Sequence, residues 1–169
     1  MVIISNYRLE KQGGFYFVIT NEASNCPVCQ ELLLRRGTRQ RVYYIVVVDE
    51  SERKTLIIRR LHCRKCDCIH HEIPDCIVPY KRYGVEVIEN TLNNQMEGVP
   101  DEPNTVRRIR RWWEAVRPYF LAILQSVAEK YKVTFNRPPT IREIVRAVTN
   151  SNNWISANQI CTRSDSRPG

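Results

Sequence analysis

Short apolar runs separated by polar turns fill the first 80 residues of the chain. Residues of β-branched, aromatic or aliphatic type are concentrated at 15–20, 32–34, 42–48 and 55–58. Such residues favour extended backbone, so each run predicts a strand. Between the last two runs, segment 49–54 is polar throughout and predicts an exposed hairpin loop. The N-terminal half is therefore predicted to be rich in β-structure.

After Pro79 the spacing of apolar residues changes to that of helices. Val85, Ile88 and Leu92 follow one another at intervals of three and four, which predicts a short helix. Segment 93–103 contains Gly and Pro residues that cannot continue it. The second half of the chain is therefore predicted to be helical.

The strongest periodic signal predicts a long amphipathic helix. Its apolar stripe keeps intervals of three and four on both sides of Pro118, so we expect one bent helix or two stacked helices. Asn104 or Thr105 is placed as the N-cap. The stripe consists of Val106, Ile109, Trp113, Val116, Phe120, Ile123 and Val127.

A last helix is predicted to begin with a capping box. Thr140 is followed three residues later by Glu143, an arrangement in which the two side chains satisfy each other's backbone N–H groups. One apolar face follows, made of Ile141, Ile144, Val145 and Val148. Residues 150–169 are rich in Ser, Asn and Arg and are predicted to form a flexible tail.

Two C-x-x-C pairs are the most specific motif in the chain. Cys26 and Cys29 form the first pair, and Cys63 and Cys66 form the second. Two intervening residues let a tight turn direct both thiolates at one ion, and two such turns complete the tetrahedron that Zn²⁺ prefers. The spacing predicts a zinc ribbon with one structural Zn²⁺, without the open coordination position that catalysis needs.

Further metal-binding residue types lie close to the second pair. Cys68 could replace Cys66 as a ligand, because C-x-C pairs also bind metals. His70, His71 and Glu72 suggest a zinc-dependent hydrolase as an alternative function. They lack the i, i+4 histidine spacing of zinc proteases, and adjacent strand residues point to opposite faces. We therefore expect no catalytic residues and no small-molecule substrate.

The composition excludes several classes of protein. With 169 residues, 43% of them apolar and 26% charged, the chain is typical of a globular protein. Its longest apolar run, 42–48, is far shorter than the roughly 18 to 20 residues that span a bilayer, so no membrane partner is expected. The first residues do not resemble a secretion signal. We expect a cytoplasmic location, where cysteines serve metals more often than disulfides.

The net charge of +8 is concentrated in the second half of the chain. Residues 1–99 hold 14 Lys and Arg against 12 Asp and Glu, whereas residues 100–169 hold 12 against 6. Four of the basic residues occupy the first turns of the long helix, opposite its apolar stripe, where they repel one another and oppose the helix dipole. This arrangement predicts an anionic partner. The residues are Arg107, Arg108, Arg110 and Arg111.

A helix with arginines on its first turns is also how a helix-turn-helix presents its DNA contacts. The helix at 85–92 would then be the first helix of the motif. Because segment 93–103 is too short for a further helix, the motif would be abbreviated. These observations predict DNA as the partner and the four arginines as the nucleic-acid contacts.

The segment from Cys63 to Tyr83, with its His-His, Pro-Asp and Pro-Tyr-Lys-Arg-Tyr elements, resembles an uncharacterised bacterial zinc-ribbon domain family. Members of that family are similar to the N-terminal, DNA-binding regions of insertion-sequence transposases. The resemblance extends to the first C-x-x-C pair and to the helix start at Asn104, so it spans roughly residues 25 to 125. The family commonly has glycine at the position of Asp67 and serine at that of Gly84. The resemblance implies zinc ligation by the four cysteines and a DNA-related role in mobile elements.

Together these inferences predict an α+β protein in three parts. A β-rich zinc-ribbon domain occupies 1–80, a helical region 81–149 and the tail 150–169. The predicted function is non-catalytic DNA binding, as an accessory or remnant of a mobile element, because the chain has no room for a transposase catalytic domain. The main alternative is an adaptor that binds a protein partner through the ribbon and the amphipathic helix.

Overall fold

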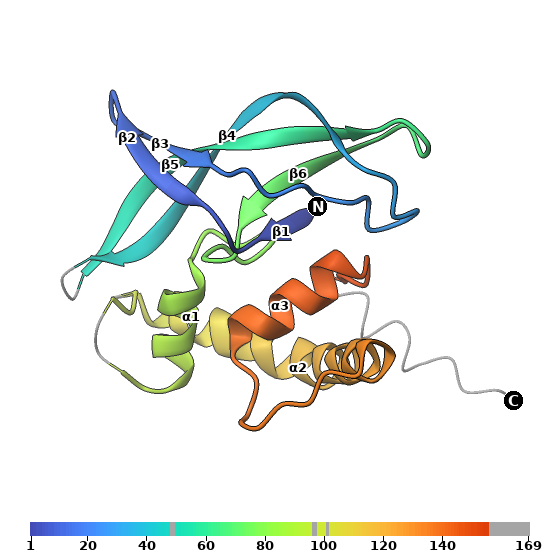
Figure 1. The fold of residues 1–169 in the computed structure, drawn as a ribbon. Coiled ribbons are helices and arrows are strands. Elements are labelled where there is room, and N and C mark those ends of the chain that lie inside the picture. The colour runs from blue at the N-terminus through green and yellow to red at the C-terminus, as the bar shows by residue number, and fades with distance from the viewer. Residues whose placement is uncertain (48–49, 96–97, 101, 156–169) are drawn as a thin grey trace, which may run out of the picture.

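The computed structural model describes residues 1–47, 50–95, 98–100 and 102–155. It confirms an α+β fold, with an N-terminal curled sheet of six strands and three helices later in the chain (Figure 1). The strands are β1 (Val2–Ile4), β2 (Arg8–Gln12), β3 (Phe15–Ile19), β4 (Leu34–Val47), β5 (Glu50–Cys63) and β6 (Cys68–Pro74). The helices are α1 (Val85–Leu92), α2 (Pro103–Tyr131) and α3 (Ile141–Asn150). None of these helices is both long and apolar enough to cross a bilayer.

Strand β5 organises the sheet. It pairs along its whole length with β4 in an antiparallel hairpin whose register shifts between Arg35 and Gly37. On its other edge, β6 pairs antiparallel with the second half of β5, and β3 pairs parallel with its middle. The sheet is completed by β1, which is parallel to β6, and by β2, which is antiparallel to β3.

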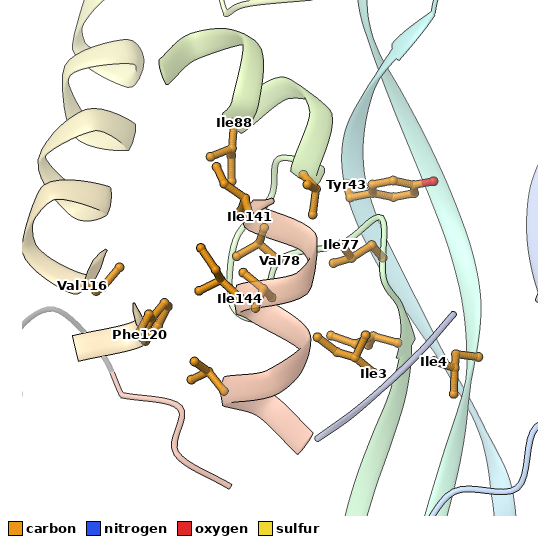
Figure 2. Close-up of a cluster of buried hydrophobic side chains, with 14 of the residues drawn as sticks. Ile3, Ile4, Tyr43, Ile77, Val78, Ile88, Val116, Phe120, Ile141 and Ile144 are labelled. Atoms are coloured by element: carbon orange, nitrogen blue, oxygen red, sulfur yellow. The ribbon is translucent and has the colours of Figure 1, made fainter. Parts of the chain in front are cut away.

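The alternation of side chains along β5 gives the sheet two differently covered faces. Leu56 and Ile58 join the main core under the helices, whereas Leu61 and Cys63 join a second, smaller cluster around the cysteines. Helix α3 lies between α2 and the sheet, and its residue Ile144 is buried in the main core (Figure 2). The helices thus cover part of one face of the sheet, and the cysteine-bearing segment covers the other face near Leu61 and Cys63.

The helix at Val85–Leu92 is confirmed, and so is the capping box of the last helix. The Thr140 hydroxyl accepts a hydrogen bond from Glu143 N, and the Glu143 carboxylate accepts one from Thr140 N. Of the two arrangements expected around Pro118, the chain adopts one continuous helix. These elements depend on contacts between residues close in sequence, which the sequence pattern records directly.

Two details predicted for the long helix are wrong. The N-cap is Glu102 rather than Asn104 or Thr105, because Pro103 occupies the first helical position, where its fixed φ and missing N–H cost nothing. The buried face is also rotated from the predicted stripe, with Trp112 more buried than Trp113. Its buried residues are Thr105, Ile109, Trp112, Val116, Phe120 and Leu124.

The predicted strands were too short. Of the run at 32–34, only Leu34 lies in β4, which continues through the arginine-rich stretch and the second run as far as Val47. Residues 50–54 of the predicted hairpin loop are part of β5, while 48–49 lie outside the described residues. Backbone hydrogen bonds between β4 and β5 do not depend on side-chain type, so the pairing extends both strands through polar sequence.

The division into parts at residues 80 and 149 stays a prediction. Most of the tail predicted at 150–169 lies outside the described residues, which end at Ile155. Within them, the Trp154 ring packs on Phe120, with ring centres 5.0 Å apart. The main core takes residues from both halves of the chain, including Ile73 from β6 and Val116 from α2.

Candidate functional site

The two C-x-x-C pairs lie on two turns of similar construction. In the first turn, Cys26 N donates to Glu31 O at 2.8 Å and Gln30 N donates to Cys26 O at 2.8 Å. The second turn links β5 to β6, where Cys63 pairs with Cys68. The residue after each pair has left-handed backbone, with φ of 63° at Gln30 and 52° at Asp67. This conformation turns the chain back after the second cysteine of each pair.

The residue type of Asp67 suits the left-handed conformation at this position. Aspartate adopts the left-handed region more readily than most residues. Its Oδ1 also lies 2.8 Å from His62 Nε2, across the turn. At Gly84, α1 begins without a side-chain cap.

The four predicted cysteines come together. The Sγ atoms of Cys26, Cys29, Cys63 and Cys66 all lie within 4.8 Å of one another. Cys26 and Cys63 are fully buried, and the sulfurs of Cys29 and Cys63 are 3.5 Å apart. A tetrahedral zinc site with Zn–S bonds of about 2.3 Å has sulfur–sulfur edges of about 3.8 Å. The cluster could therefore hold one metal ion, and its donors are compatible with zinc.

Electrostatics also favour a cation at the cluster. The pKa of the Cys66 thiol is raised, first by its hydrogen bond with Cys29 and then by burial. Four neighbouring thiolates would repel one another unless a cation lay between them, and a bound divalent ion stabilises the deprotonated form. Cys66 N donates to Cys63 Sγ at 3.4 Å, and His70 Nε2 lies 3.5 Å from Cys26 Sγ. These contacts hold the sulfurs in position from outside the cluster.

Cys68, His71 and Glu72 make contacts that do not involve the sulfurs of the cluster. Cys68 is exposed, and its Sγ donates to Cys66 O at 3.3 Å. His71 lies on the opposite face of β6 from His70, where Arg39 Nη1 donates to its Nε2 at 3.4 Å. Glu72 is buried in an ion pair with Arg59. The structure thus separates the two histidines and gives the carboxylate a partner.

All four predicted arginines of α2 are exposed, but they contact different parts of the molecule. Arg107, Arg108 and Arg111 line an open groove of about 490 Å³. Arg110 points to the C-terminal end of α1, where its guanidinium donates to Thr91 O at 3.2 Å and to Asn94 Oδ1 at 2.7 Å. A cation there complements the negative end of the helix dipole. Three of the four arginines therefore face one hollow, and the fourth joins two helices.

A second hollow of about 410 Å³ adjoins this groove and shares Lys81, Arg108 and Trp112 with it. Lys81 Nζ lies 4.2 Å from the centre of the Trp112 ring. Burial, and next the neighbouring Arg108, lower the pKa of Lys81. We call the two hollows together the basic groove, and its polar and aromatic lining is Tyr80, Lys81, Arg82, Tyr83, Asn104, Arg107, Arg108, Arg111 and Trp112.

Residues 80–83 also line the groove, although they were not among the predicted nucleic-acid contacts. The signal was present in the Tyr-Lys-Arg-Tyr run, which alternates aromatic and basic residues. This run contributes to the groove because it lies on the connector between β6 and α1, which runs beside the first turns of α2. Arg41 fixes this connector to the sheet, because its Nη2 donates to Lys81 O at 3.1 Å.

Comparison with known proteins identifies one family. Residues 26–112 match the family described as Domain of unknown function (DUF6431). No curated protein and no solved structure matches the chain. The matched segment begins at the first cysteine of the cluster and ends at Trp112 in the basic groove, so both features lie within it. Since the match covers more than half of the chain, the protein belongs to the DUF6431 family.

Proposed function

We propose that this protein is a non-catalytic DNA-binding protein whose sheet is stabilised by one Zn²⁺ ion. The observation that carries the proposal is the basic groove, which gathers Lys81, Arg82 and three arginines of α2. No carboxylate lines it in the described part of the chain. The five cations have no ion-pair partner among the described residues. Because they lie along one groove they repel one another, so an anionic polymer that enters the groove relieves the repulsion.

The geometry of the groove suits a phosphate backbone. Arg107 and Arg111 are one helical turn apart and exposed, and neither makes an ion pair with any described residue. Lys81 faces them from the connector and is held over Trp112. Contacts of this kind position a nucleic acid without reading its sequence.

The metal's proposed role is structural. When Zn²⁺ is bound, the four thiolates of Cys26, Cys29, Cys63 and Cys66 would fill its coordination shell and leave no position for a substrate. The ion would fasten the first cysteine turn to the β5–β6 turn. Strand β6 leads from that turn into the connector that carries Lys81, so the metal centre and the groove belong to one continuous path of the chain.

Binding is tested by fluorescence anisotropy with labelled duplex and single-stranded DNA. If Lys81, Arg107, Arg108 and Arg111 each neutralise one phosphate, log K falls with log salt at a slope of about −3.6 on duplex. That slope is a loss of about a hundredfold between 50 and 200 mM salt. Absence of salt-dependent binding to either form contradicts the proposal.

A matched pair of variants localises the interaction. Arg107→Gln with Arg111→Gln should weaken binding and reduce the salt slope by about 2, because two phosphate contacts are lost. Arg117→Gln removes an exposed arginine of the same helix that does not line the groove, and should leave affinity nearly unchanged. A loss in Arg117→Gln of about half that in the double variant, in proportion to the charge removed, would indicate a diffuse charge effect instead of a site.

The resemblance to transposase DNA-binding regions supports the finer proposal that the DNA belongs to a mobile element. The adaptor alternative predicts that the groove variants lose a protein partner while DNA affinity is retained. The hydrolase alternative needs Glu72 as a base, and this carboxylate accepts hydrogen bonds from both Arg59 and Ser24. X-ray absorption that shows four sulfur ligands would exclude an open catalytic zinc.

A further inference from the structure

Tyr80 has a backbone conformation that its residue type disfavours. Lys81 N donates to Val78 O at 3.1 Å, which closes a four-residue turn with Pro79 second and Tyr80 third. The φ of Tyr80 is 59°. A positive φ at the third residue of a turn, directly after a proline at the second, is typical of a type II turn. Glycine is preferred at that third residue because it has no Cβ to clash. A tyrosine at this position strains the backbone.

The sheet holds this turn from both ends. Arg41 Nη2 donates to Val78 O at 3.4 Å and to Lys81 O at 3.1 Å, on either side of Tyr80. Arg41 belongs to β4 and is half-buried. The strained turn is therefore fixed by a side chain from another element, so its conformation is set by the fold and does not depend on local preference alone.

Packing does not explain why a tyrosine occupies this position. Its side chain is 72% exposed, the most exposed large hydrophobic residue in the described part of the chain. Its one described ring contact is with Trp154, at a centre-to-centre distance of 6.2 Å and a tilt of 37°. Glycine would relieve the strain and lose little burial. The ring is instead held out beside Lys81, at the rim of the basic groove.

We propose that Tyr80 is a stacking platform for an unpaired nucleobase, and that the basic groove binds single-stranded DNA. This inference rests on the proposed DNA-binding function and specifies its substrate. An exposed aromatic ring beside a row of cations is the arrangement by which proteins bind single strands, because every base has a face that can stack. In duplex DNA the base faces are covered by their neighbours, so a fixed ring at the rim gains nothing from an intact helix.

The experiment compares a labelled 12-nucleotide single strand with a duplex of the same length by anisotropy. Tyr80→Gly should weaken single-strand binding by about 5- to 150-fold, the loss expected for one stacked base. Duplex affinity should not change, and the melting temperature should not fall, because glycine suits the turn. Tyr80→Phe should retain single-strand binding. Tyr131→Ala, which removes an exposed tyrosine remote from the groove lining, is the matched control.

A second measurement detects stacking directly. A single 2-aminopurine in the oligonucleotide should be quenched on binding to the wild type and to Tyr80→Phe, but not to Tyr80→Ala. Unchanged single-strand affinity in Tyr80→Gly, or binding to duplex only, overturns the inference and leaves the proposed DNA-binding function standing. If the wild type binds neither form, the proposed function itself fails.

Discussion

Arg59 and Glu72 form a two-point ion pair beneath the segment that leads to the first cysteine turn. Arg59 Nη2 donates to Glu72 Oε1 at 2.8 Å, and its Nε donates to the other carboxylate oxygen. The Ser24 hydroxyl donates to Glu72 at 2.7 Å, and Arg59 also donates to Glu22 O at 3.1 Å. The pair therefore ties the chain before Cys26 to the sheet.

Replacing Arg59 with leucine should destabilise the protein by about 3 to 5 kcal/mol, because Glu72 is only 1% exposed and would be left as a buried unpaired charge. The double variant with Glu72→Leu should lose less, since both charges are then removed. Urea unfolding of the zinc-loaded protein measures both. A double variant no more stable than Arg59→Leu alone contradicts this account.

One zinc ion should be bound per chain, and its removal should unfold the sheet. Structural zinc contributes on the order of 10 kcal/mol in small domains, so strong chelation should abolish the strand signal in circular dichroism. Cys26→Ser and Cys63→Ser should lose the metal, as measured by elemental analysis. Cys68→Ser is the control, because this thiol is exposed and outside the cluster, and it should retain zinc. Unchanged spectra in a verified metal-free sample would contradict the structural role.

Substitution of Arg110 should lower mainly the stability of the protein, whereas substitution of Arg107 should lower mainly its DNA affinity. Both side chains are exposed. Arg110→Gln removes the hydrogen bonds to Thr91 and Asn94, and should lower stability by about 1 kcal/mol with little change in DNA affinity. Arg107→Gln should leave stability within about 0.5 kcal/mol and weaken DNA binding. Chemical unfolding and anisotropy on the same two variants distinguish the roles. Equal changes in stability and in DNA affinity in the two variants would show that Arg107 and Arg110 do not have different roles.

The capping box of α3 should contribute measurably to stability. Thr140→Ala removes the acceptor for Glu143 N and should cost about 1 kcal/mol. Thr134→Ala, an exposed threonine before the helix, should change stability by less than about 0.5 kcal/mol. The comparison is made by thermal unfolding. A loss in both variants of equal size would argue against a specific cap.

Acid should destabilise the protein partly through His71. Burial, and next the charges of Arg39 and Arg60, lower the pKa of His71. The unfolded chain takes up a proton near pH 6.5 and the folded chain resists it, so stability is present above that pH and is lost as the pH falls below it. His71→Gln should reduce the difference in melting temperature between pH 7.5 and 5.5. An unchanged difference would show that His71 does not contribute.

Local interactions explain which parts of the structure could be predicted from the sequence. The cysteine turns, α1 and the capping box of α3 depend on residues within about four positions of one another, so spacing and residue type record them. The sequence also identified four cysteines that could share an ion, because paired turns joined by a hairpin meet. Even the wrong N-cap of α2 was displaced by only two or three residues.

Only the tertiary structure decided which side chains from distant segments become neighbours. The helix pattern predicted four equivalent arginines, and only the packing of α2 on α1 directed Arg110 to the C-terminal end of α1. Tyr80 and Lys81 reached the groove because Arg41 and the course of β6 hold their connector beside α2. The ion pair of Arg59 with Glu72 arises from strand register, which no local pattern specifies. Sequence patterns record local periodicity, whereas the groove depends on contacts between residues far apart in the chain.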